Sequence, residues 1–236
     1  MTMVLIALAC ALTGYLFGAF PTGYFVGRLW NIDVRKHGSG RTGGTNVLRT
    51  AGWGAFALTV IGDVLKGVLP VLLSRWLFPD ARDAHTLAVL GALVGHNWSV
   101  FIAMLAKPDP RITYAPAPFG WIQRVAQQGR GGAGVATSAA AMLALFPPIV
   151  LVMVVPIILI LVIVRYASVA SLTTAILSPF VMLFFVWNGS APWSYLILNG
   201  VVSTIIVIVH IPNIQRLRAG NERRFGYQLG RKKHEA

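Results

Sequence analysis

Charged side chains are scarce in this chain of 236 residues: Asp, Glu, Lys and Arg make up 11% of it, against 56% hydrophobic residues. A soluble domain usually carries about a quarter charged residues, so the composition excludes an ordinary soluble domain and indicates that a bilayer covers much of the surface. Acidic residues are the scarcest, with 7 Asp and Glu against 20 Lys and Arg. The single cysteine, Cys10, lies in an apolar run, which excludes an internal disulfide and a cysteine-rich metal site.

Long apolar runs account for the mean hydropathy of +0.69. No basic residue precedes the first run, so we interpret it as a permanent helix rather than a removable signal peptide. Pro147-Pro148 interrupts one long run and predicts a tight turn between a short helix and the next one. Judged against the ~20 residues that a spanning helix needs, seven segments are expected to cross the membrane: 3–27, 52–74, 85–105, 133–147, 148–165, 168–187 and 194–212.

The basic residues indicate how these segments are oriented. With seven spans, Arg75 and Arg82 fall on one side, Lys66 falls within a span, and every other Lys and Arg falls on the side of the C-terminus. The excess of Lys and Arg on cytoplasmic loops then predicts an N-terminus outside and a C-terminus in the cytoplasm. Because the net charge of +13 gathers beside apolar spans, anionic lipid explains it better than nucleic acid does.

The sequence therefore predicts an all-α integral membrane protein with seven transmembrane helices. We expect a single polytopic domain over residues 1–236, with cytoplasmic loops 28–51 and 106–132 and a cytoplasmic tail 213–236. The stretch 106–128 is too polar to insert and too rich in proline for a long helix, so we expect it on the surface.

Two glycine-rich stretches on the predicted cytoplasmic side are candidates for anion binding. Residues 38–49 read GSGRTGGTNVLR, and residues 129–138 read GRGGAGVATS and open a predicted helix. Glycines let backbone N–H groups converge on an anion, arginine adds a planar fork of donors, and a helix N-terminus adds its dipole. Close packing of helices through small residues is the structural alternative for the second stretch. No P-loop pattern is present, so a nucleotide site is not supported.

Ionisable residues inside the predicted spans are further candidates. Asp63 and Lys66 are three residues apart on one helix face, and His96 interrupts the third span. Such groups usually pair or line a polar cavity, so a buried ion pair that only orients helices and a packing histidine remain alternatives. His210 and Asn213 end the last span and could together hold a hydroxyl or a phosphate oxygen.

Taken together, these motifs resemble the bacterial acyl-phosphate:glycerol-3-phosphate acyltransferase family (PlsY). Residues 38–49 are similar to its G-S-G-N-x-G-A-T-N-V-x-R motif, 63–67 to D-x-x-K-G, 95–96 to G-H, and 131–137 to G-G-K-G-V-A-T. Residues 210–222 are similar to H-x-x-N-I-x-R-L-x-x-G-x-E. The order and spacing of the motifs carry the resemblance, which covers nearly the whole chain.

The resemblance implies transfer of a fatty acyl group from acyl phosphate to the 1-hydroxyl of glycerol 3-phosphate, giving lysophosphatidic acid and phosphate in phospholipid biosynthesis. It implies an inner (plasma) membrane enzyme with a cytoplasmic active face, membrane lipids as surroundings, and no metal, cofactor or nucleic acid. The acyl-phosphate-forming enzyme is a candidate partner. The catalytic residues implied are Ser39, Arg49, His210 and Asn213. The substrate-binding residues implied are Gly40, Arg41, Gly43, Thr45, Asn46, Asp63, Lys66, His96, Arg130, Gly131, Gly132, Gly134 and Glu222.

Two departures from the family pattern concern charge. Arg41 stands where the family has Asn, and Ala133 stands where it has Lys. Arginines at 41, 124 or 130 are candidates to replace the missing Lys. The alternatives are a homologue that is inactive or uses another acceptor, and a small transporter, which would predict an internal repeat that the sequence lacks.

Overall fold

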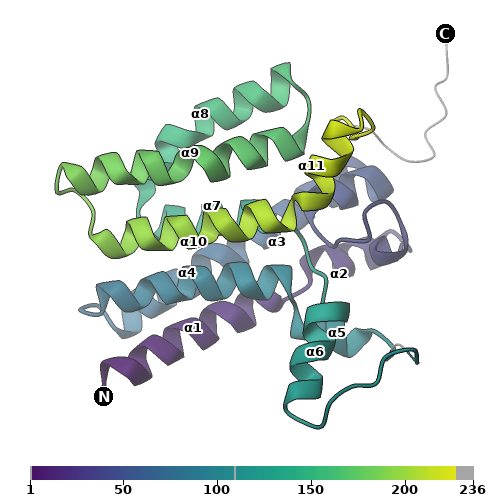
Figure 1. The fold of residues 1–236 in the computed structure, drawn as a ribbon, viewed down its shortest axis with the longest axis horizontal. Helices are drawn as coiled ribbons and strands as arrows, with labels where there is room; N and C mark the ends of the chain where they lie inside the picture. The colour runs from purple at the N-terminus through teal and green to yellow at the C-terminus, as the bar shows by residue number, and fades with distance from the viewer. Residues whose placement is uncertain (1, 109, 227–236) are drawn as a thin grey trace.

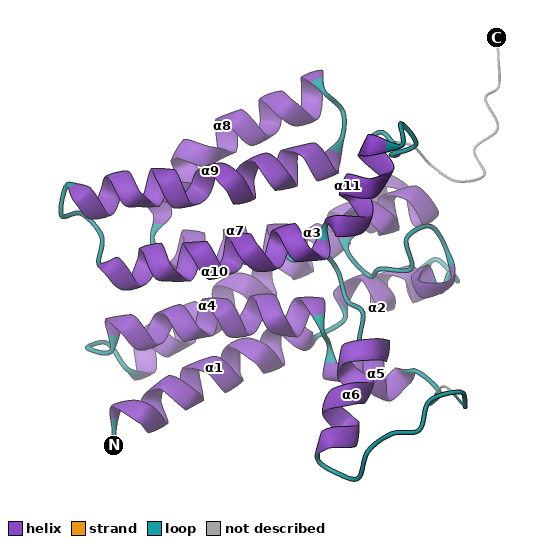
Figure 2. Ribbon diagram, in the orientation of Figure 1, coloured by secondary structure: helices purple, strands orange, loops and turns teal. Residues whose placement is uncertain are grey.

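The computed structural model describes residues 2–108 and 110–226, and within them every regular element is a helix (Figure 2). Apolar segments in a bilayer are expected to be helical, because a helix satisfies its backbone hydrogen bonds internally where no water is available to do so. The elements are α1 (Met3–Ala19), α2 (Thr22–Leu29), the 3-10 helix η1 (Val34–Lys36), α3 (Gly44–Leu77), α4 (Arg82–Asn97), α5 (Val100–Leu105), α6 (Phe119–Gln128), α7 (Val135–Leu145), α8 (Pro147–Ile163), α9 (Ala167–Trp187), α10 (Trp193–Val209) and α11 (Ile211–Arg218).

The long helices lie side by side and the polar segments gather at one end (Figure 1). The N-terminus and the α3–α4 and α9–α10 connections lie at one end, whereas α2, α5, α6 and α11 lie at the other. Small residues allow the closest contacts: a Cβ added at Gly14 or Gly18 of α1 would collide with the backbone of Ala88 or Ala92 of α4. Such contacts are typical of helix pairs in membranes, where backbones approach closely.

Three helical stretches are long and apolar enough to cross a membrane: Met3–Leu29, Gly44–Leu77 and Ala167–Trp187. A fourth candidate is α10 with α11, which is bent by 53°. The apolar helices α7 and α8 are shorter, with 11 and 17 residues. Outward-facing side chains such as Val155 and Ile163 are 58% and 74% exposed, as expected of a surface covered by lipid. The count of seven spans and their orientation stay predictions.

Several predicted segments are interrupted in the structure. α8 begins at Pro147, which confirms the predicted break there. The segment expected over 3–27 breaks before Thr22, where Pro21 precedes α2, and the segment expected over 85–105 breaks at Trp98 and Ser99. The polar stretch 106–128 carries α6, which the sequence reading missed because its prolines all precede Phe119.

Candidate active site

The two glycine stretches meet at the polar end of the molecule. Gly43 caps the N-terminus of α3, and Gly134 caps the N-terminus of α7. A Cβ added at Gly43 would lie 3.1 Å from Cα of Gly132, so the two loops touch. Each helix start leaves backbone N–H groups without an intrahelical partner and carries the positive end of a dipole. Two such ends side by side form a place suited to an anion.

Asn46, in the first turn of α3, shapes the first loop. Its Oδ1 accepts a hydrogen bond from the Ser39 amide at 2.9 Å. Its Nδ2 lies 2.8–3.1 Å from the carbonyls of Val34, His37 and Arg41. The side chain is 3% exposed. Asn46 therefore holds the loop that carries Ser39, Gly40 and Arg41, and its side chain is occupied by the protein itself.

The second loop is held against the end of α4. The Gly131 amide donates to the Asn97 carbonyl at 3.0 Å. A Cβ at Gly132 would collide with Nε2 of His96, so only glycine fits there. Gly134 has φ of +84°, a conformation that glycine adopts at little cost. These positions explain the glycines by close approach and backbone turning, while the loop still presents its amides at the start of α7.

Arg41 joins three segments of the site. Its guanidinium donates to the carbonyl of Gly132 at 3.0 Å and to that of Val209 at 3.1 Å. In residues 2–108 and 110–226, no carboxylate lies within ion-pair distance of it. Burial, followed by the neighbouring charges of Arg130 and Arg216, lowers the pKa of Arg41 from its usual 12.5 to about 10. An anion beside this guanidinium would relieve that penalty.

Arg49 is a second cation in the same region, and it is buried whereas Arg41 is half-buried. Arg49 is 6% exposed, its Nη2 donates to the Arg223 carbonyl at 3.3 Å, and its Nε has no hydrogen-bond partner in the part of the chain that the structure describes. The chain after α11 covers it, because Phe225 packs edge-on against Trp53 and Phe56 at 5.8 and 5.9 Å between ring centroids. Arg49 thus lies under the tail with donor capacity to spare.

Asp63, Lys66 and His96 form a separate cluster between helices. Lys66 Nζ lies 2.9 Å from Asp63 Oδ1 and donates to the Phe20 carbonyl at 3.0 Å. His96 Nδ1 lies 3.7 Å from the same carboxylate oxygen and 3.1 Å from Thr137 Oγ1. All of these side chains are buried. The cluster is satisfied largely within itself and touches the second loop through His96.

His210 and Asn213 lie at the junction of α10 and α11. His210 is 4% exposed, and its Nδ1 donates to the Ile206 carbonyl at 2.8 Å, which leaves Nε2 as the acceptor of the neutral ring. Asn213 Nδ2 donates to Glu222 at 3.0 Å. Glu222 also accepts from Arg216 at 2.7 Å and from Ser168 at 3.3 Å. Glu222 therefore fixes the tail to α9 and α11 as well as holding Asn213.

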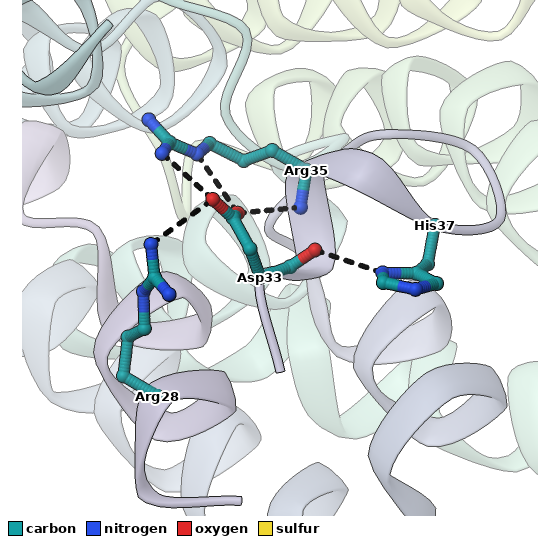
Figure 3. A network of polar contacts seen from close by, with 4 residues as sticks. All are labelled: Arg28, Asp33, Arg35 and His37. Carbon is teal, nitrogen blue, oxygen red and sulfur yellow. Dashed lines mark hydrogen bonds and ion pairs between the residues drawn. The ribbon is translucent and has the colours of Figure 1, made fainter. Parts of the chain in front are cut away.

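A polar network anchors the segment that leads into the first loop (Figure 3). Asp33 accepts hydrogen bonds from Arg28 at 3.1 Å and from Arg35 at 2.9 and 3.0 Å, and its carbonyl accepts from His37 Nδ1 at 3.0 Å. Hydrogen bonding from Arg35 lowers the pKa of the Asp33 carboxyl below its usual value. The network fixes η1 and hence the start of the loop.

The structure thus brings most of the predicted residues to one end but gives them different surroundings. Ser39 Oγ accepts a long hydrogen bond of 3.5 Å from the Arg41 amide, Thr45 is half-buried in the first turn of α3, and Arg130 is exposed. Arg216 and Thr137 belong to the motifs that the sequence singled out but were not predicted as site residues; in the structure Arg216 donates to Glu222 and Thr137 Oγ1 lies 3.1 Å from His96 Nδ1. Among the described residues, no three His, Cys, Asp or Glu side chains group as metal ligands would.

Comparison with known proteins adds to this geometry. The family model of glycerol-3-phosphate acyltransferase matches residues 8–106 and 113–220. The chain is similar to a glycerol-3-phosphate acyltransferase of Rubrobacter xylanophilus, with 37% identity over 93% of this chain and 95% of the relative. It is also similar to glycerol-3-phosphate acyltransferase 2 of Moorella thermoacetica, with 37% identity over 95% and 98% of the two chains.

Two crystal structures of PlsY (YgiH), an integral membrane glycerol 3-phosphate acyltransferase, share the fold. Its glycerol 3-phosphate form superposes with a TM-score of 0.74 at 30% identity, and its lysophosphatidic acid form with 0.72 at 29%. Each match covers 93% of this chain and 95% of the other. The residues matched by the family model include both glycine stretches, Arg41 and Arg49.

Proposed function

This chain belongs to the glycerol-3-phosphate acyltransferase family, and from that premise we propose that it transfers a fatty acyl group from acyl phosphate to the 1-hydroxyl of glycerol 3-phosphate. It is a membrane acyltransferase of phospholipid synthesis, and its products are lysophosphatidic acid and phosphate. The observation that carries the proposal is the meeting of two helix N-termini beside Arg41, a half-buried cation without a carboxylate partner in residues 2–108 and 110–226. Both substrates bring the phosphate that such a site requires.

The reaction requires little covalent chemistry from the protein. The glycerol hydroxyl oxygen attacks the acyl carbonyl carbon, the bond from that carbon to the phosphate oxygen breaks, and phosphate leaves with both electrons. The hydroxyl proton goes to a phosphate oxygen, so that no protein base is required; His210 is the alternative acceptor, since its Nε2 is free to accept. The protein then acts by positioning the substrates and stabilising negative charge.

The roles of individual residues follow from their surroundings. Arg41, Arg49 and the amides at the starts of α3 and α7 bind phosphate, and Arg130 adds charge at the rim. Ser39 and His210 contact the reacting groups, and Asn213 is positioned by Glu222. Asn46 and the glycines shape the loops, whereas Asp63, Lys66 and His96 support the second loop from behind.

Membrane topology completes the proposal. The polar end of Figure 1 would face the cytoplasm, where soluble glycerol 3-phosphate is available, with the N-terminus outside and seven crossings of the inner membrane. The acyl-phosphate-forming enzyme is the proposed partner, because acyl phosphate is a reactive lipid that benefits from direct delivery. An inactive or acceptor-altered homologue is the second candidate, and the observation in its favour is the uncharged Ala133 in the second loop.

The test is phosphate release by the purified protein from palmitoyl phosphate, with and without glycerol 3-phosphate. We expect release that depends on glycerol 3-phosphate and is matched by lysophosphatidic acid. Folded protein that releases no phosphate with this acceptor would contradict the proposal. Turnover with another phosphorylated alcohol would then identify an altered acceptor.

A further inference from the structure

The chain after α11 lies at the polar end of the molecule, beside the first glycine loop (Figure 1). The residues matched by the family model end at 220, whereas the structure describes the chain as far as Gly226. We call residues 221–226 the tail segment. We propose that Arg223 of this segment is a further phosphate-binding residue of the active site, which deepens the function proposed above and rests on it.

Contacts on both sides of Arg223 hold the tail segment in place. Before it, the Glu222 carboxylate accepts a hydrogen bond from Arg216 at 2.7 Å. After it, the Phe225 amide donates to the Arg165 carbonyl at 2.6 Å, and the Phe225 ring packs edge-on against two aromatic rings of α3. Because the residues around it are fixed, the backbone of Arg223 has a defined position beside the site.

The backbone and the side chain of Arg223 both reach the site. Its carbonyl accepts a hydrogen bond from Nη2 of Arg49 at 3.3 Å. A Cβ added at Gly38 would lie 3.8 Å from Nη1 of Arg223, so the guanidinium lies close to the residue that opens the first glycine loop. One residue of the tail segment therefore adjoins both the loop and the buried cation that are proposed to bind phosphate.

The guanidinium of Arg223 has its donors available for a ligand. The residue is exposed, and within residues 2–108 and 110–226 its side chain makes no hydrogen bond and no ion pair. Arg41 differs, because the carbonyls of Gly132 and Val209 accept from its guanidinium. A guanidinium on a long, untied side chain can turn onto a phosphate and bind it through two N–H groups. Arg223 is therefore suited to close over an anion held by the loop amides and Arg49.

The group proposed to bind Arg223 is a terminal phosphate, and glycerol 3-phosphate and acyl phosphate each carry one. The alternative for an exposed arginine on a cytoplasmic tail is attraction to anionic lipid. The next residue, Arg224, is exposed as well, and in the part of the chain that the structure describes its side chain makes no hydrogen bond or ion pair. Lipid attraction would involve the two arginines alike, whereas phosphate binding at the loop requires Arg223.

Arg223→Gln removes the charge and keeps a long polar side chain. We expect it to raise the KM for one substrate about fivefold, the effect of losing one exposed charged contact, and to leave kcat and the other KM within about twofold. Each KM is measured by phosphate release with the other substrate saturating. A rise confined to glycerol 3-phosphate, or one confined to palmitoyl phosphate, would support the proposal and identify the phosphate that Arg223 binds. No rise in either KM, or an equal rise in both, would overturn it.

Arg223→Lys and Arg224→Gln are the matched controls. Arg223→Lys keeps the charge and should restore most of the affinity that Arg223→Gln loses. Arg224→Gln makes the same change one residue along and should leave both KM values unchanged. Added salt should raise the affected KM more in the wild type than in Arg223→Gln, because salt screens an exposed charge. Equal effects of Arg223→Gln and Arg224→Gln, or the same salt dependence with and without Arg223, would overturn the proposal.

Release of the tail segment tests whether the position of Arg223 matters. Phe225→Ala removes the ring that packs against α3 and should raise the same KM as Arg223→Gln. Adding Arg223→Gln to Phe225→Ala should raise it little further, because the arginine acts only while the tail segment is held. Fully additive effects would mean that Arg223 does not act from this position, which would overturn the proposal.

Binding without turnover separates this proposal from the proposed function. Glycerol 3-phosphate alone and hexadecylphosphonate alone cannot react, so calorimetry gives their affinities for the purified protein whether or not it is active. Arg223→Gln should weaken one of these two ligands about fivefold. Wild-type protein that shows this difference but releases no phosphate from palmitoyl phosphate would contradict the proposed function and leave Arg223 as a phosphate ligand. Unchanged affinities for both ligands in Arg223→Gln, or a wild type that binds neither, would overturn the role of Arg223.

Discussion

The Asp63–Lys66 pair is buried, and of the two arginines of the site Arg49 is buried and Arg41 is half-buried, but the surroundings of these charges differ. Lys66 has a carboxylate at 2.9 Å and a carbonyl at 3.0 Å, so its positive charge is compensated by the protein. Within residues 2–108 and 110–226, Arg41 has only carbonyl acceptors, and Arg49 keeps an Nε without a hydrogen-bond partner. A charge with an opposite partner holds the fold together, whereas a cation that lacks one is prepared for a ligand anion.

The largest effect expected from this comparison is on stability. Lys66→Met leaves the Asp63 carboxylate buried without its cation, and breaking a buried pair in this way typically costs about 3–5 kcal/mol. We expect the variant to unfold at a much lower temperature in detergent, or not to accumulate. Thermal unfolding followed by tryptophan fluorescence measures the loss.

The double variant Asp63→Leu with Lys66→Met is the control for that experiment. Replacing both charges by apolar groups is often close to neutral, so the double variant should regain much of the stability that the single variant loses. A double variant as unstable as Lys66→Met would show that the two charges are not each other's main partner.

Arg49→Ala should show the opposite behaviour, with activity lost and the fold retained. Among the described residues the guanidinium makes one long hydrogen bond, of 3.3 Å, so little of the fold depends on it. Removing a donor that stabilises developing charge typically costs 100-fold or more in turnover, and we expect at least about 100-fold. Phosphate release from palmitoyl phosphate measures turnover, and thermal unfolding within a few degrees of wild type checks the fold. Turnover close to wild type would remove Arg49 from the site.

Variants of Arg41 and Ala133 test whether the positive charge that the family carries in the second glycine loop, at position 133, is carried in the first loop by Arg41 in this chain. Arg41 reaches the carbonyl of Gly132, the residue next to Ala133. We expect Arg41→Asn to raise the KM for glycerol 3-phosphate about tenfold, the effect of losing one charged hydrogen bond. Adding Ala133→Lys to that variant should restore the KM, because the charge returns within the same site. Ala133→Lys alone should leave activity unchanged or raise it.

The same residue predicts a pH dependence. Arg41 is charged below a pKa of about 10 and neutral above it, so affinity for glycerol 3-phosphate in the wild type should fall as the pH rises through 10. In Arg41→Asn this fall should be smaller. An identical pH dependence in both proteins would exclude Arg41 as the group that titrates.

Much of this arrangement follows from sequence, for physical reasons that can be named. Pro147 cannot continue α7, and Gly52, with φ of +87°, bends α3 where the predicted span begins. The glycine stretches mark the loops because close approach and positive φ leave no room for a side chain, as at Gly132 and Gly134. These are local constraints, and the residue types at these positions are enough to predict them.

The remainder depends on contacts between distant segments. No local pattern states that Arg41 would donate to Val209, or that Asn213 would be turned to Glu222. α6 was not predicted, because the prolines before Phe119 argued against a long helix in its segment. The number of membrane spans also stays a prediction. A helix as short as α7 can end inside a helix bundle without crossing the membrane, and composition does not determine where such a helix ends.

The smallest expected effect concerns Asp33, which anchors the first loop rather than forming part of the site. Its partners Arg28 and Arg35 are 50% and 22% exposed, and exposed ion pairs contribute about 0.2–1 kcal/mol. Because hydrogen bonding from Arg35 lowers the Asp33 pKa, its contribution to stability is present above the ordinary carboxyl pKa and is lost as the pH falls through the lowered value. Asp33→Asn should therefore unfold slightly earlier than wild type at pH 7, and the difference should shrink as the pH falls below about 4. Paired unfolding curves across that range measure it. A difference that stays constant with pH would mean that Asp33 acts through the shape of η1 and not through its charge. Of the two carboxylates compared, Asp63 would then be the one whose ionisation matters.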